Sequence, residues 1–490
     1  MKLADLLAGI DYTVIQGTEQ TEVGHITYDS RKVRERSMFV CIQGFKLDGH
    51  DYIREAARKG AAVVLIQRDI DDLPPGICAV KAADTRKLVP LLAHRFYGEP
   101  SKRLNTVAIT GTNGKTSVST IIAAILESAG RKTGVIGTIH NRIGDQVLKM
   151  EKTTYTTPEA LDLHALFKRM LDEGAGDVVM EATSMALELH RLDHTDIDIG
   201  VFTNLTQDHL DDHKTMENYM NAKLKLFRMC KRGIVNADDP TAEVIRREGS
   251  CEITTYGVTN DADLKASDVS LSSEEVAFTV AAGGEAVRMK LRIPGIFSVY
   301  NALAAIAVCL ELGLSLEQIA CGLASVEGVE GRFQTIAASR GYSVIVDYAH
   351  TPDALDNVLS TVKGFAKGQI ITVFGCGGDR DRTKRPIMGS IAGTHSDVCI
   401  ITSDNPRTED PVMIMEDIEA GLAETGCRYE TIEDRKAAIH RALALAKPED
   451  VVVIAGKGHE NYQEVMGVKH HFDDSEVVRQ FIGKEVASRD

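Results

Sequence analysis

The stretch TVAITGTNGKT, Thr106–Thr116, decides the fold class of this chain of 490 residues. The apolar run TVAI is typical of a buried strand, and the residues from Ser117 onward have helical spacing. A glycine-containing turn between a strand and a helix lets backbone N–H groups close around phosphate oxygens. Lys115 is then placed to reach the terminal phosphates, and the Thr116 hydroxyl to hold Mg²⁺. The stretch therefore predicts a nucleotide-binding α/β domain.

The turn differs from the generic phosphate loop at one position. The pattern GxxxxGK[ST] would have its first glycine at Ile109, so a glycine at Gly111 makes this loop a shortened variant. The alternative is a glycine-rich connection that binds no phosphate. The adjoining strand and helix favour phosphate. The predicted binding residues are Gly111, Thr112, Asn113, Gly114, Lys115, Thr116 and Ser117.

Strand-like and helix-like segments alternate on both sides of this loop. Before it, SMFVCIQG and AAVVLIQ flank a helical stretch, and FYGEPSKRLN is typical of a linker. After it, TGVIGT, DVVMEAT, IGVFTN and GIVNADD alternate with helices, which predicts a largely parallel sheet. Apolar and polar residues alternate from 262 to 290, which predicts an antiparallel hairpin added to this sheet.

Four further strands follow Arg332, and each ends in a polar or glycine-rich turn: YSVIVDYAH, QIITVFGCGG, DVCIITSDNP and DVVVIAGKGHE. In open parallel sheets ligands bind beyond the carboxyl ends of the strands, so these turns are candidate site segments. We expect an α/β protein of three domains. The first domain covers residues 1–100. The central parallel-sheet domain with the phosphate loop covers 101–332, and a Rossmann-like domain covers 333–490.

Composition narrows the function classes. The net charge of −15 argues against a surface built for nucleic acid or anionic membrane. No apolar run reaches the roughly 20 residues that span a bilayer, and the N-terminus lacks the pattern of a signal peptide. Nine scattered cysteines without a CxxC pair favour reduced thiols. We expect a cytoplasmic monomer that acts on small molecules, without nucleic-acid partners or membrane insertion.

Several motifs in consistent order make the chain similar to the Mur ligases, ATP-dependent amide-bond-forming enzymes of peptidoglycan precursor synthesis. Besides TGTNGKT, they include VVMEATS, NLTQDHLDDH, YMNAKLKLF, NADDP and VDYAHTPDAL, and the resemblance extends from Asp29 to about residue 475. It implies three domains that bind a UDP-sugar, ATP and an amino acid. It also implies that ATP contacts extend to Asn301, Arg332 and Asp347.

The resemblance implies a metal site with two Mg²⁺ ions. Its expected ligands are Thr116, Glu181, His209 and Lys223, and the expected catalytic residues are Lys115, Lys223 and His209. An ordinary lysine does not bind a metal, but in this family the matching lysine is carbamylated, which makes it an anionic ligand. Without the resemblance, the simpler interpretations are structural. Lys223 would be a solvent-facing lysine, Glu181 a residue at a strand end, and the Asp-His pair part of a turn.

The substrate residues resemble those of the ligase that adds the third amino acid of the peptide, to UDP-MurNAc-L-Ala-D-Glu. The residues expected to bind this UDP-sugar dipeptide are Ser30, Thr156, Thr157, Thr183 and Arg191. The DNPR sequence resembles that of the family members that add meso-diaminopimelate. The distal carboxylate of this amino acid suits a bidentate arginine. The expected diaminopimelate contacts are Arg380, Asp404, Asn405, Pro406, Arg407, Gly456 and Glu460. An Asx–Pro turn with a surface arginine is the structural alternative.

Four positions depart from the family pattern. Thr183 stands for a serine, Met185 for a histidine, Leu189 for a glutamine and Ser298 for an asparagine. They indicate either sequence drift in an ordinary enzyme or a paralogue with an altered carboxylate or amino-acid substrate, for example L-lysine. Two other function classes share some of these motifs. A folylpolyglutamate synthase-like ligase would share the loop but not DNPR, and a nucleotide-binding regulator would have no need of Glu181 and Lys223.

Overall fold

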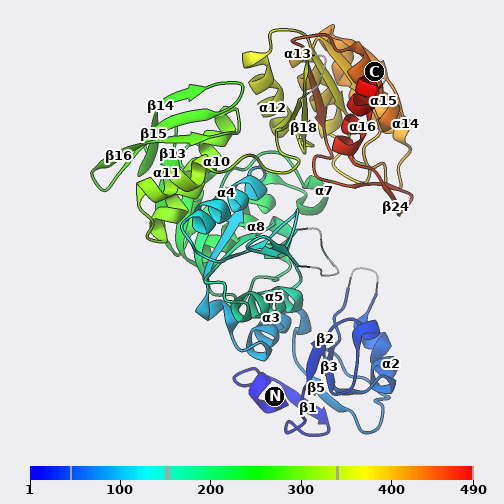
Figure 1. Ribbon diagram of the computed structural model, residues 1–490. Helices are drawn as coiled ribbons and strands as arrows, with labels where there is room; N and C mark the ends of the chain where they lie inside the picture. Colours follow the sequence, from blue (N-terminus) through cyan, green and yellow to red (C-terminus); the bar gives the residue numbers. More distant parts are fainter. Residues whose placement is uncertain (45–46, 149–153, 155, 338–340, 488–490) are drawn as a thin grey trace. The chain divides into compact units, whose positions relative to one another are not determined.

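The computed structural model describes residues 1–490 apart from 45–46, 149–153, 155, 338–340 and 488–490 (Figure 1). The chain divides into two compact units. The first unit comprises Met1–Ala108, Arg131–Gly200 and Lys225–Lys231, and the second comprises Ile109–Gly130, Val201–Leu224 and Arg232–Asp490. In the described part of the chain, no helix is long and apolar enough to cross a membrane.

The first unit begins with a five-stranded sheet in the order β1-β5-β4-β3-β2. Only β1 runs antiparallel to its neighbour. The elements are α1 (Leu3–Leu6), β1 (Thr13–Gln16), β2 (His25–Thr27), β3 (Ser37–Val40), α2 (Ile53–Arg58), β4 (Ala61–Ile66), β5 (Cys78–Lys81) and α3 (Thr85–Phe96). Alternate strand residues supply two apolar clusters, as expected for a sheet that is covered on both faces.

The segment FYGEPSKRLN is not a simple linker, contrary to the prediction. Its first residue, Phe96, ends α3, and Pro100 begins the 3₁₀ helix η3 (Pro100–Arg103). Proline suits a first helical position because its fixed φ is already helical and its missing N–H would have no helical partner there. Helix α3 packs against α5 (Ala160–Asp172) within the first unit.

The middle of the chain forms an eleven-stranded sheet in the order β16-β15-β14-β13-β12-β11-β6-β10-β7-β8-β9. The pairs β10–β7, β12–β13 and β13–β14 are parallel. The strands are β6 (Asn105–Thr110), β7 (Thr133–Ile136), β8 (Arg142–Ile143), β9 (Gln146–Val147), β10 (Asp177–Glu181), β11 (Ile197–Phe202), β12 (Cys230–Asn236), β13 (Glu252–Gly257), β14 (Leu264–Leu271), β15 (Val276–Ala282) and β16 (Glu285–Leu291).

The antiparallel addition predicted at 262–290 is present but has three strands, because β14, β15 and β16 form a meander. In the second unit α4 packs against both α10 and α11. The helices of the middle segment are α4 (Lys115–Ser128), α6 (Ser184–Glu188), α7 (Leu210–His213), α8 (Met216–Met229), α9 (Thr241–Glu248), α10 (Ile296–Glu311) and α11 (Leu316–Ala324).

The second unit ends in a six-stranded sheet in the order β17-β18-β22-β19-β20-β21, in which only β17 is antiparallel. Its strands are β17 (Gln334–Ala337), β18 (Ser343–Asp347), β19 (Ile370–Phe374), β20 (Val398–Ile401), β21 (Arg428–Thr431) and β22 (Val451–Ala455). The four strands predicted after Arg332 are therefore all present, and they lie next to one another as β18, β22, β19 and β20.

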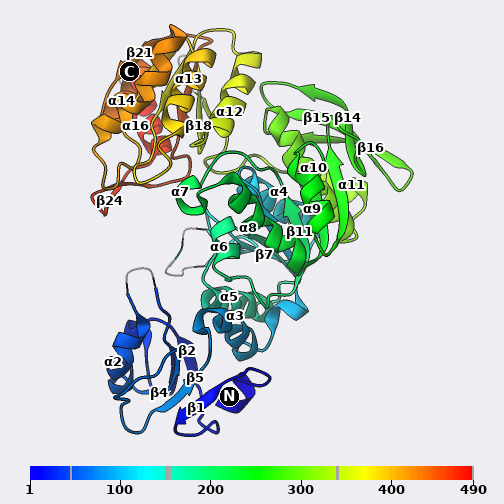
Figure 2. The ribbon, with the colours of Figure 1, turned by 180° about the vertical axis from the view of Figure 1, so that it is seen from behind.

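Helices cover this C-terminal sheet. Apolar residues of α15 and α16 pack on one set of alternate strand residues, while α12, α13 and α14 pack side by side and contact β20 or β22 (Figures 1 and 2). The elements are α12 (Pro352–Phe365), α13 (Lys384–His395), α14 (Pro411–Leu422), α15 (Arg435–Leu445), α16 (Asp474–Ala487) and the hairpin β23 (Tyr462–Val465) and β24 (Val468–His471).

Candidate active site

The predicted phosphate loop connects β6 to α4, and two of its positions require glycine. Gly111 has φ +149° and Gly114 has φ +89°. A Cβ atom at Gly111 would lie 1.8 Å from Thr203 Oγ1, and one at Gly114 would lie 2.6 Å from Asn301 Oδ1. Both contacts are far shorter than van der Waals separation, so a larger residue would displace the loop. Asn301, a predicted ATP contact, therefore lies next to the loop.

The segment that follows β11 fixes the loop through its backbone. The Thr112 N–H donates to the Asn204 carbonyl at 2.9 Å, and the Asn113 N–H donates to Asn204 Oδ1 at 2.9 Å. Thr203 Oγ1 donates to the Asn113 carbonyl at 2.6 Å. The beginning of NLTQDHLDDH thus forms part of the loop's support. Asn236 in turn holds this segment, since its Nδ2 donates to the Thr203 carbonyl at 2.9 Å.

The NADDP sequence supports the backbone on the same side of the sheet. Asp239 accepts the Leu205 N–H at 2.7 Å, and Asp238 accepts the N–H groups of 258–260 and the Tyr300 hydroxyl. Burial acts to raise the pKa of Asp238, but these hydrogen bonds outweigh it and hold the pKa below its ordinary value. We interpret this sequence as a brace for the loops that adjoin the phosphate loop.

Lys115 and Thr116 lie at the start of α4. Lys115 Nζ donates to the carbonyls of Gly111 and Thr112, at 2.8 and 2.9 Å. Thr116 is buried, and Arg332 Nη2 lies 3.4 Å from its Oγ1. Two cationic side chains from distant parts of the sequence therefore meet at the helix N-terminus, which itself carries partial positive charge. This is a suitable environment for a polyphosphate.

The predicted ATP residues Arg332 and Asp347 have different roles in the structure. The Arg332 guanidinium lies 4.2 Å from the centroid of the Tyr348 ring, a cation–π arrangement. The buried Asp347 carboxylate accepts the N–H groups of Phe333 and Ala349, at 2.6 and 2.7 Å. Asp347 thus ties the segment that carries Arg332 to the end of β18, while burial raises its pKa.

Lys223 is buried in α8, contrary to the simpler interpretation of a solvent-facing lysine. Its Nζ lies 4.3 Å from the centroid of the Tyr219 ring, and the Tyr219 hydroxyl lies 3.2 Å from Thr112 Oγ1. Burial, together with the nearby charge of Lys115, lowers the pKa of Lys223 well below its ordinary value. A neutral amine is the form that reacts with CO₂, so this environment fits a carbamylated lysine.

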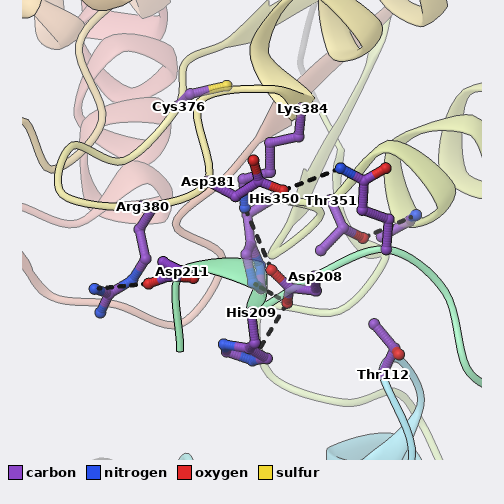
Figure 3. A network of polar contacts seen from close by, with 12 residues as sticks. Thr112, Asp208, His209, Asp211, His350, Thr351, Cys376, Arg380, Asp381 and Lys384 are labelled. Atoms are coloured by element: carbon purple, nitrogen blue, oxygen red, sulfur yellow. Dashed lines mark hydrogen bonds and ion pairs between the residues drawn. The ribbon is translucent and has the colours of Figure 1, made fainter. Parts of the chain in front are cut away.

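Figure 3 shows Asp208 among three basic side chains. The nearest nitrogens of His209, Lys384 and His350 lie 3.3, 3.6 and 3.9 Å from its carboxylate. Burial would raise the pKa of Asp208, but these charges outweigh it and lower the pKa. Burial lowers the pKa of His350 to about 4, and its Nδ1 donates to the Tyr348 carbonyl at 2.8 Å.

Sequence reasoning singled out His209 but missed Asp208, His350 and Lys384. Asp208 and His350 lie in the quoted motifs NLTQDHLDDH and VDYAHTPDAL, and Lys384 lies in GCGGDRDRTKRP, which follows the strand QIITVF. The available signal was the occurrence of ionisable residues in each of three segments that follow strands. Near this group, Arg380 lies 3.9 Å from Asp211, also visible in Figure 3.

The donor set in this region suits a hard divalent cation. His209, Asp211 and Asp212 offer ligand atoms within 4.8 Å of one another, and oxygen donors are those that Mg²⁺ prefers. Of the predicted ligands, Thr116, His209 and Lys223 belong to the second unit. Glu181, the fourth predicted ligand, belongs to the first unit.

Glu181 is buried at the end of β10. Its two oxygens accept the Thr138 N–H at 2.8 Å and the Thr138 hydroxyl at 2.9 Å. The Thr138 hydroxyl lies 3.1 Å from that of Thr156, and Thr157 Oγ1 donates to the Glu181 carbonyl at 2.9 Å. The TTPE segment and the predicted metal carboxylate are thus one connected network.

The other predicted dipeptide residues join the same network. Thr183 Oγ1 lies 3.1 Å from Thr157 Oγ1 and caps α6 by accepting the Ala186 N–H. Arg191 donates to the Thr157 carbonyl at 3.2 Å and pairs with Glu159 at 2.8 Å. Four of the five predicted residues therefore lie together in the first unit. Ser30 lies apart from these contacts, in the short 3₁₀ helix η1 (Ser30–Lys32), where its carbonyl accepts Lys59 Nζ.

The predicted amino-acid residues gather at the carboxyl ends of β19, β20 and β22. Arg407 adopts φ +52° and exchanges backbone hydrogen bonds with the β23–β24 hairpin, at Glu464 and Met466. Its Nη1 donates to the Gly378 carbonyl at 2.7 Å. Pro406 lies against the same glycine, since a Cβ at Gly378 would be 2.0 Å from the Pro406 carbonyl oxygen. The DNPR arginine is therefore held in place and is not an unconstrained surface side chain.

Behind this arginine lie Asp404, Asn405, Gly456 and Glu460. Asn405 Nδ2 donates to Glu460 Oε2 at 2.9 Å. Gly456 has φ +118°, and a Cβ there would lie 2.6 Å from Asp404 Oδ2. Arg380, by contrast, is more exposed and donates to the Asp379 carbonyl. The turns after three strands thus bring basic side chains and several acceptor groups together.

The departures from the family pattern occupy two kinds of position. Ser298 is buried, and its hydroxyl donates to the Pro294 carbonyl at 2.8 Å, inside the start of α10. Thr183 retains the capping hydroxyl, as described above. Met185 and Leu189 are partly exposed, within α6 and at its C-terminal end. The hydroxyl at 298 therefore bonds within the start of its own helix.

Family models match residues 22–93 (Mur ligase family, catalytic domain), 109–309 (Mur ligase middle domain) and 331–458 (Mur ligase, glutamate ligase domain). The chain is 47% identical to UDP-N-acetylmuramoyl-L-alanyl-D-glutamate–2,6-diaminopimelate ligase 2 of Clostridium acetobutylicum, over 99% of this chain and 100% of the relative.

A protein of Caldanaerobacter subterraneus subsp. tengcongensis named as a ligase of this kind is 44% identical, with 99% of each chain covered. A solved structure named UDP-N-acetylmuramoyl-L-alanyl-D-glutamate–2,6-diaminopimelate ligase matches with a TM-score of 0.70 and 34% identity, over 99% of each chain. The chain therefore belongs to the Mur ligase family and has its three-domain α/β fold with a central, largely parallel sheet.

Proposed function

We propose that this chain is an ATP-dependent ligase that joins meso-2,6-diaminopimelate to the D-Glu carboxylate of UDP-MurNAc-L-Ala-D-Glu, in peptidoglycan precursor synthesis. The names of relatives at 44–47% identity over nearly the whole chain support this substrate pair. The observation that carries it is the constrained Arg407 beside the Asn405–Glu460 pair. A bidentate arginine suits the distal carboxylate of diaminopimelate, and acceptor oxygens suit its distal ammonium.

The reaction begins with activation of the carboxylate. A D-Glu carboxylate oxygen attacks the γ-phosphorus of ATP, and the bond from that phosphorus to the β–γ bridging oxygen breaks. ADP departs, and the D-Glu carboxylate has become an acyl phosphate. Lys115, Arg332 and the N-terminus of α4 would stabilise the charge on the phosphoryl oxygens. Lys115 now donates to carbonyls of its own loop, so bound phosphates would offer it stronger acceptors.

The second step forms the amide. The amine of diaminopimelate attacks the acyl carbon, phosphate leaves, and the nitrogen loses a proton. The Arg407 turn would bind the distal end of the amino acid and so orient the attacking amine. Positioning would therefore be the main contribution of this turn. The proposed dipeptide residues Thr156, Thr157, Thr183 and Arg191 would place the carboxylate, and Ser30 would contact the UDP-sugar.

Mg²⁺ is the metal that the donor set fits. Thr116, His209 and carbamylated Lys223 are proposed ligands, and Glu181 is a proposed carboxylate ligand. When bound, Mg²⁺ would supply positive charge to phosphoryl oxygens. A cytoplasmic location and a monomeric state stay predictions.

The test is an amino-acid-dependent ATPase measurement with UDP-MurNAc-L-Ala-D-Glu. We expect meso-diaminopimelate to stimulate ADP release strongly and L-lysine to stimulate it little, because lysine lacks the distal carboxylate. A preference for lysine would overturn the amino-acid assignment. Stimulation by folate substrates instead would favour the folylpolyglutamate synthase-like alternative.

A further inference from the structure

Lys457 is a fully buried lysine in the turn after β22, and the proposed reaction has not used it. Its Nζ donates to Asn405 Oδ1 at 3.1 Å and to Glu460 Oε2 at 3.0 Å. Both acceptors belong to the proposed diaminopimelate site. A buried ammonium is costly unless it is paired and hydrogen-bonded, and these two acceptors supply that pairing.

The first consequence of Lys457 is the orientation of the Asn405 amide. Asn405 Oδ1 accepts two hydrogen bonds, from Lys457 Nζ and from the Glu464 N–H at 2.9 Å. Two donors on one side of the amide fix the oxygen there, which turns the amide nitrogen toward Glu460. Without Lys457, one of the two donors that specify this orientation is lost.

The second consequence is the orientation of the Glu460 carboxylate. Its Oε2 accepts from both Lys457 Nζ and Asn405 Nδ2, at 3.0 and 2.9 Å. The side chain of Lys457 is fully buried, whereas that of Glu460 retains 14% exposure. Lys457 therefore cannot reach a ligand at the surface of the turn, but Glu460 can. Any effect of Lys457 on a ligand must pass through its two acceptors.

The surroundings of Lys457 are equally constrained. Burial would raise the pKa of Asp404, but the charges of Lys457 and Arg435 outweigh it and lower that pKa. Arg435 forms a fully buried pair with Asp474 and donates to the Ala455 carbonyl at 3.0 Å. The turn is therefore preorganised by two buried cations, of which only Lys457, in the described part of the chain, donates hydrogen bonds to Asn405 and Glu460.

We propose that Lys457 is a positioning residue for amino-acid binding, which orients Glu460 and Asn405 toward the distal ammonium of the incoming amino acid. The inference rests on the proposed function, because it assigns Glu460 as the acceptor of that ammonium. A purely structural lysine would stabilise the C-terminal sheet and leave substrate binding unchanged. A positioning lysine would alter one Michaelis constant selectively.

The test compares wild-type protein with Lys457→Met, which keeps the length and apolar stem but removes the charge and the donors. We expect the KM for meso-diaminopimelate to rise by about tenfold or more. The KM for ATP, the KM for UDP-MurNAc-L-Ala-D-Glu and kcat at saturating amino acid should stay within about twofold. An unchanged KM for diaminopimelate in a folded variant would overturn the inference.

Two further variants keep the test decisive. Thr372 is a buried residue of β19, and Thr372→Val removes the hydrogen bond between its hydroxyl and that of Ser396. This variant should lower the melting temperature and leave all three KM values unchanged. If Lys457→Met does not fold, Lys457→Gln, which keeps one donor, is measured against the same criterion. A KM for diaminopimelate that changes equally in Thr372→Val would show that general destabilisation causes the effect.

A double variant tests the route through Glu460. Combined with Glu460→Gln, Lys457→Met should raise the KM for diaminopimelate by less than the product of the two single effects, because both disturb one contact. The full product would overturn the assigned route. Failure of the proposed function looks different, since the wild-type protein would then show no ATP turnover that depends on diaminopimelate.

Discussion

Lys223 Nζ lies over the ring of Tyr219, 4.3 Å from its centroid, on the same helix face and one turn apart. The Tyr219 hydroxyl contacts Thr112 of the phosphate loop at 3.2 Å. The buried amine is therefore linked to the loop through one aromatic side chain. This arrangement keeps Lys223 away from bulk water, which lowers its pKa and favours the neutral amine.

Lys223→Ala should lower kcat/KM by about a hundredfold or more, since it would remove a proposed metal ligand. Added formate or acetate should partly restore activity by supplying a small carboxylate. The measurement is ADP release with and without these anions. Lys225→Ala is the control, because Lys225 is partly exposed and pairs with Glu188. Equal activity of Lys223→Ala and wild type would remove the proposed role.

The glycines of the phosphate loop allow a second prediction. Gly114→Ala should abolish ADP binding, because its Cβ would lie 2.6 Å from Asn301 Oδ1. Gly130 is a matched control. It has φ +79°, close to the +89° of Gly114, but no atom lies within 4 Å of a Cβ placed there. Gly130→Ala should cost only the strain of its backbone, about 1 kcal/mol. Titration with ADP and thermal unfolding would separate the two effects, and equal ADP affinity in both variants would contradict the steric argument.

Arg407→Lys should raise the KM for meso-diaminopimelate by about tenfold or more, because a lysine cannot form the planar pair of hydrogen bonds with a carboxylate. The backbone of residue 407 should keep its place, since its N–H and carbonyl are bonded to the hairpin. Arg428→Lys, on the more exposed strand β21, should leave this KM unchanged. A KM for diaminopimelate that stays at the wild-type value would indicate that Arg407 is only structural.

The local parts of the site could be predicted from the sequence. A strand, a glycine turn and a helix are contiguous in TVAITGTNGKT, so their relationship depends on neighbouring residues alone. The DNPR turn was predicted for the same reason, since it directly follows β20. The extra strand in the 262–290 region was missed because the Gly283–Gly284 turn lies within the stretch that was treated as one alternating pattern.

The long-range parts could not be predicted. Asp208 meets His350 and Lys384 across more than 140 residues of sequence, and no local pattern encodes that approach. The partner of the Ser298 hydroxyl is likewise not evident from the sequence, because in the structure it donates to the Pro294 carbonyl at the start of α10. In both cases the tertiary structure decides which of several possible partners a side chain meets.

The last prediction concerns stability and pH in the first unit. His164 is fully buried in α5, and neither ring nitrogen has a hydrogen-bond partner in the described part of the chain. Its ring lies 5.2 Å from that of His94. Burial lowers the pKa of His164 to about 3, whereas an unfolded chain would titrate near the ordinary value of 6.5.

The sign of the pH dependence follows from these two values. Below pH 6.5 His164 binds a proton in the unfolded state but stays neutral in the folded state. Its contribution to the free energy of unfolding is therefore fully present above pH 6.5 and decreases as the pH falls toward 3. The slope for one such group is about 1.4 kcal/mol per pH unit. His164→Leu should reduce that slope in urea unfolding between pH 6.5 and pH 4, while a weaker slope persists because burial also lowers the pKa of His94. An unchanged slope in the leucine variant would show that His164 is not the group that titrates.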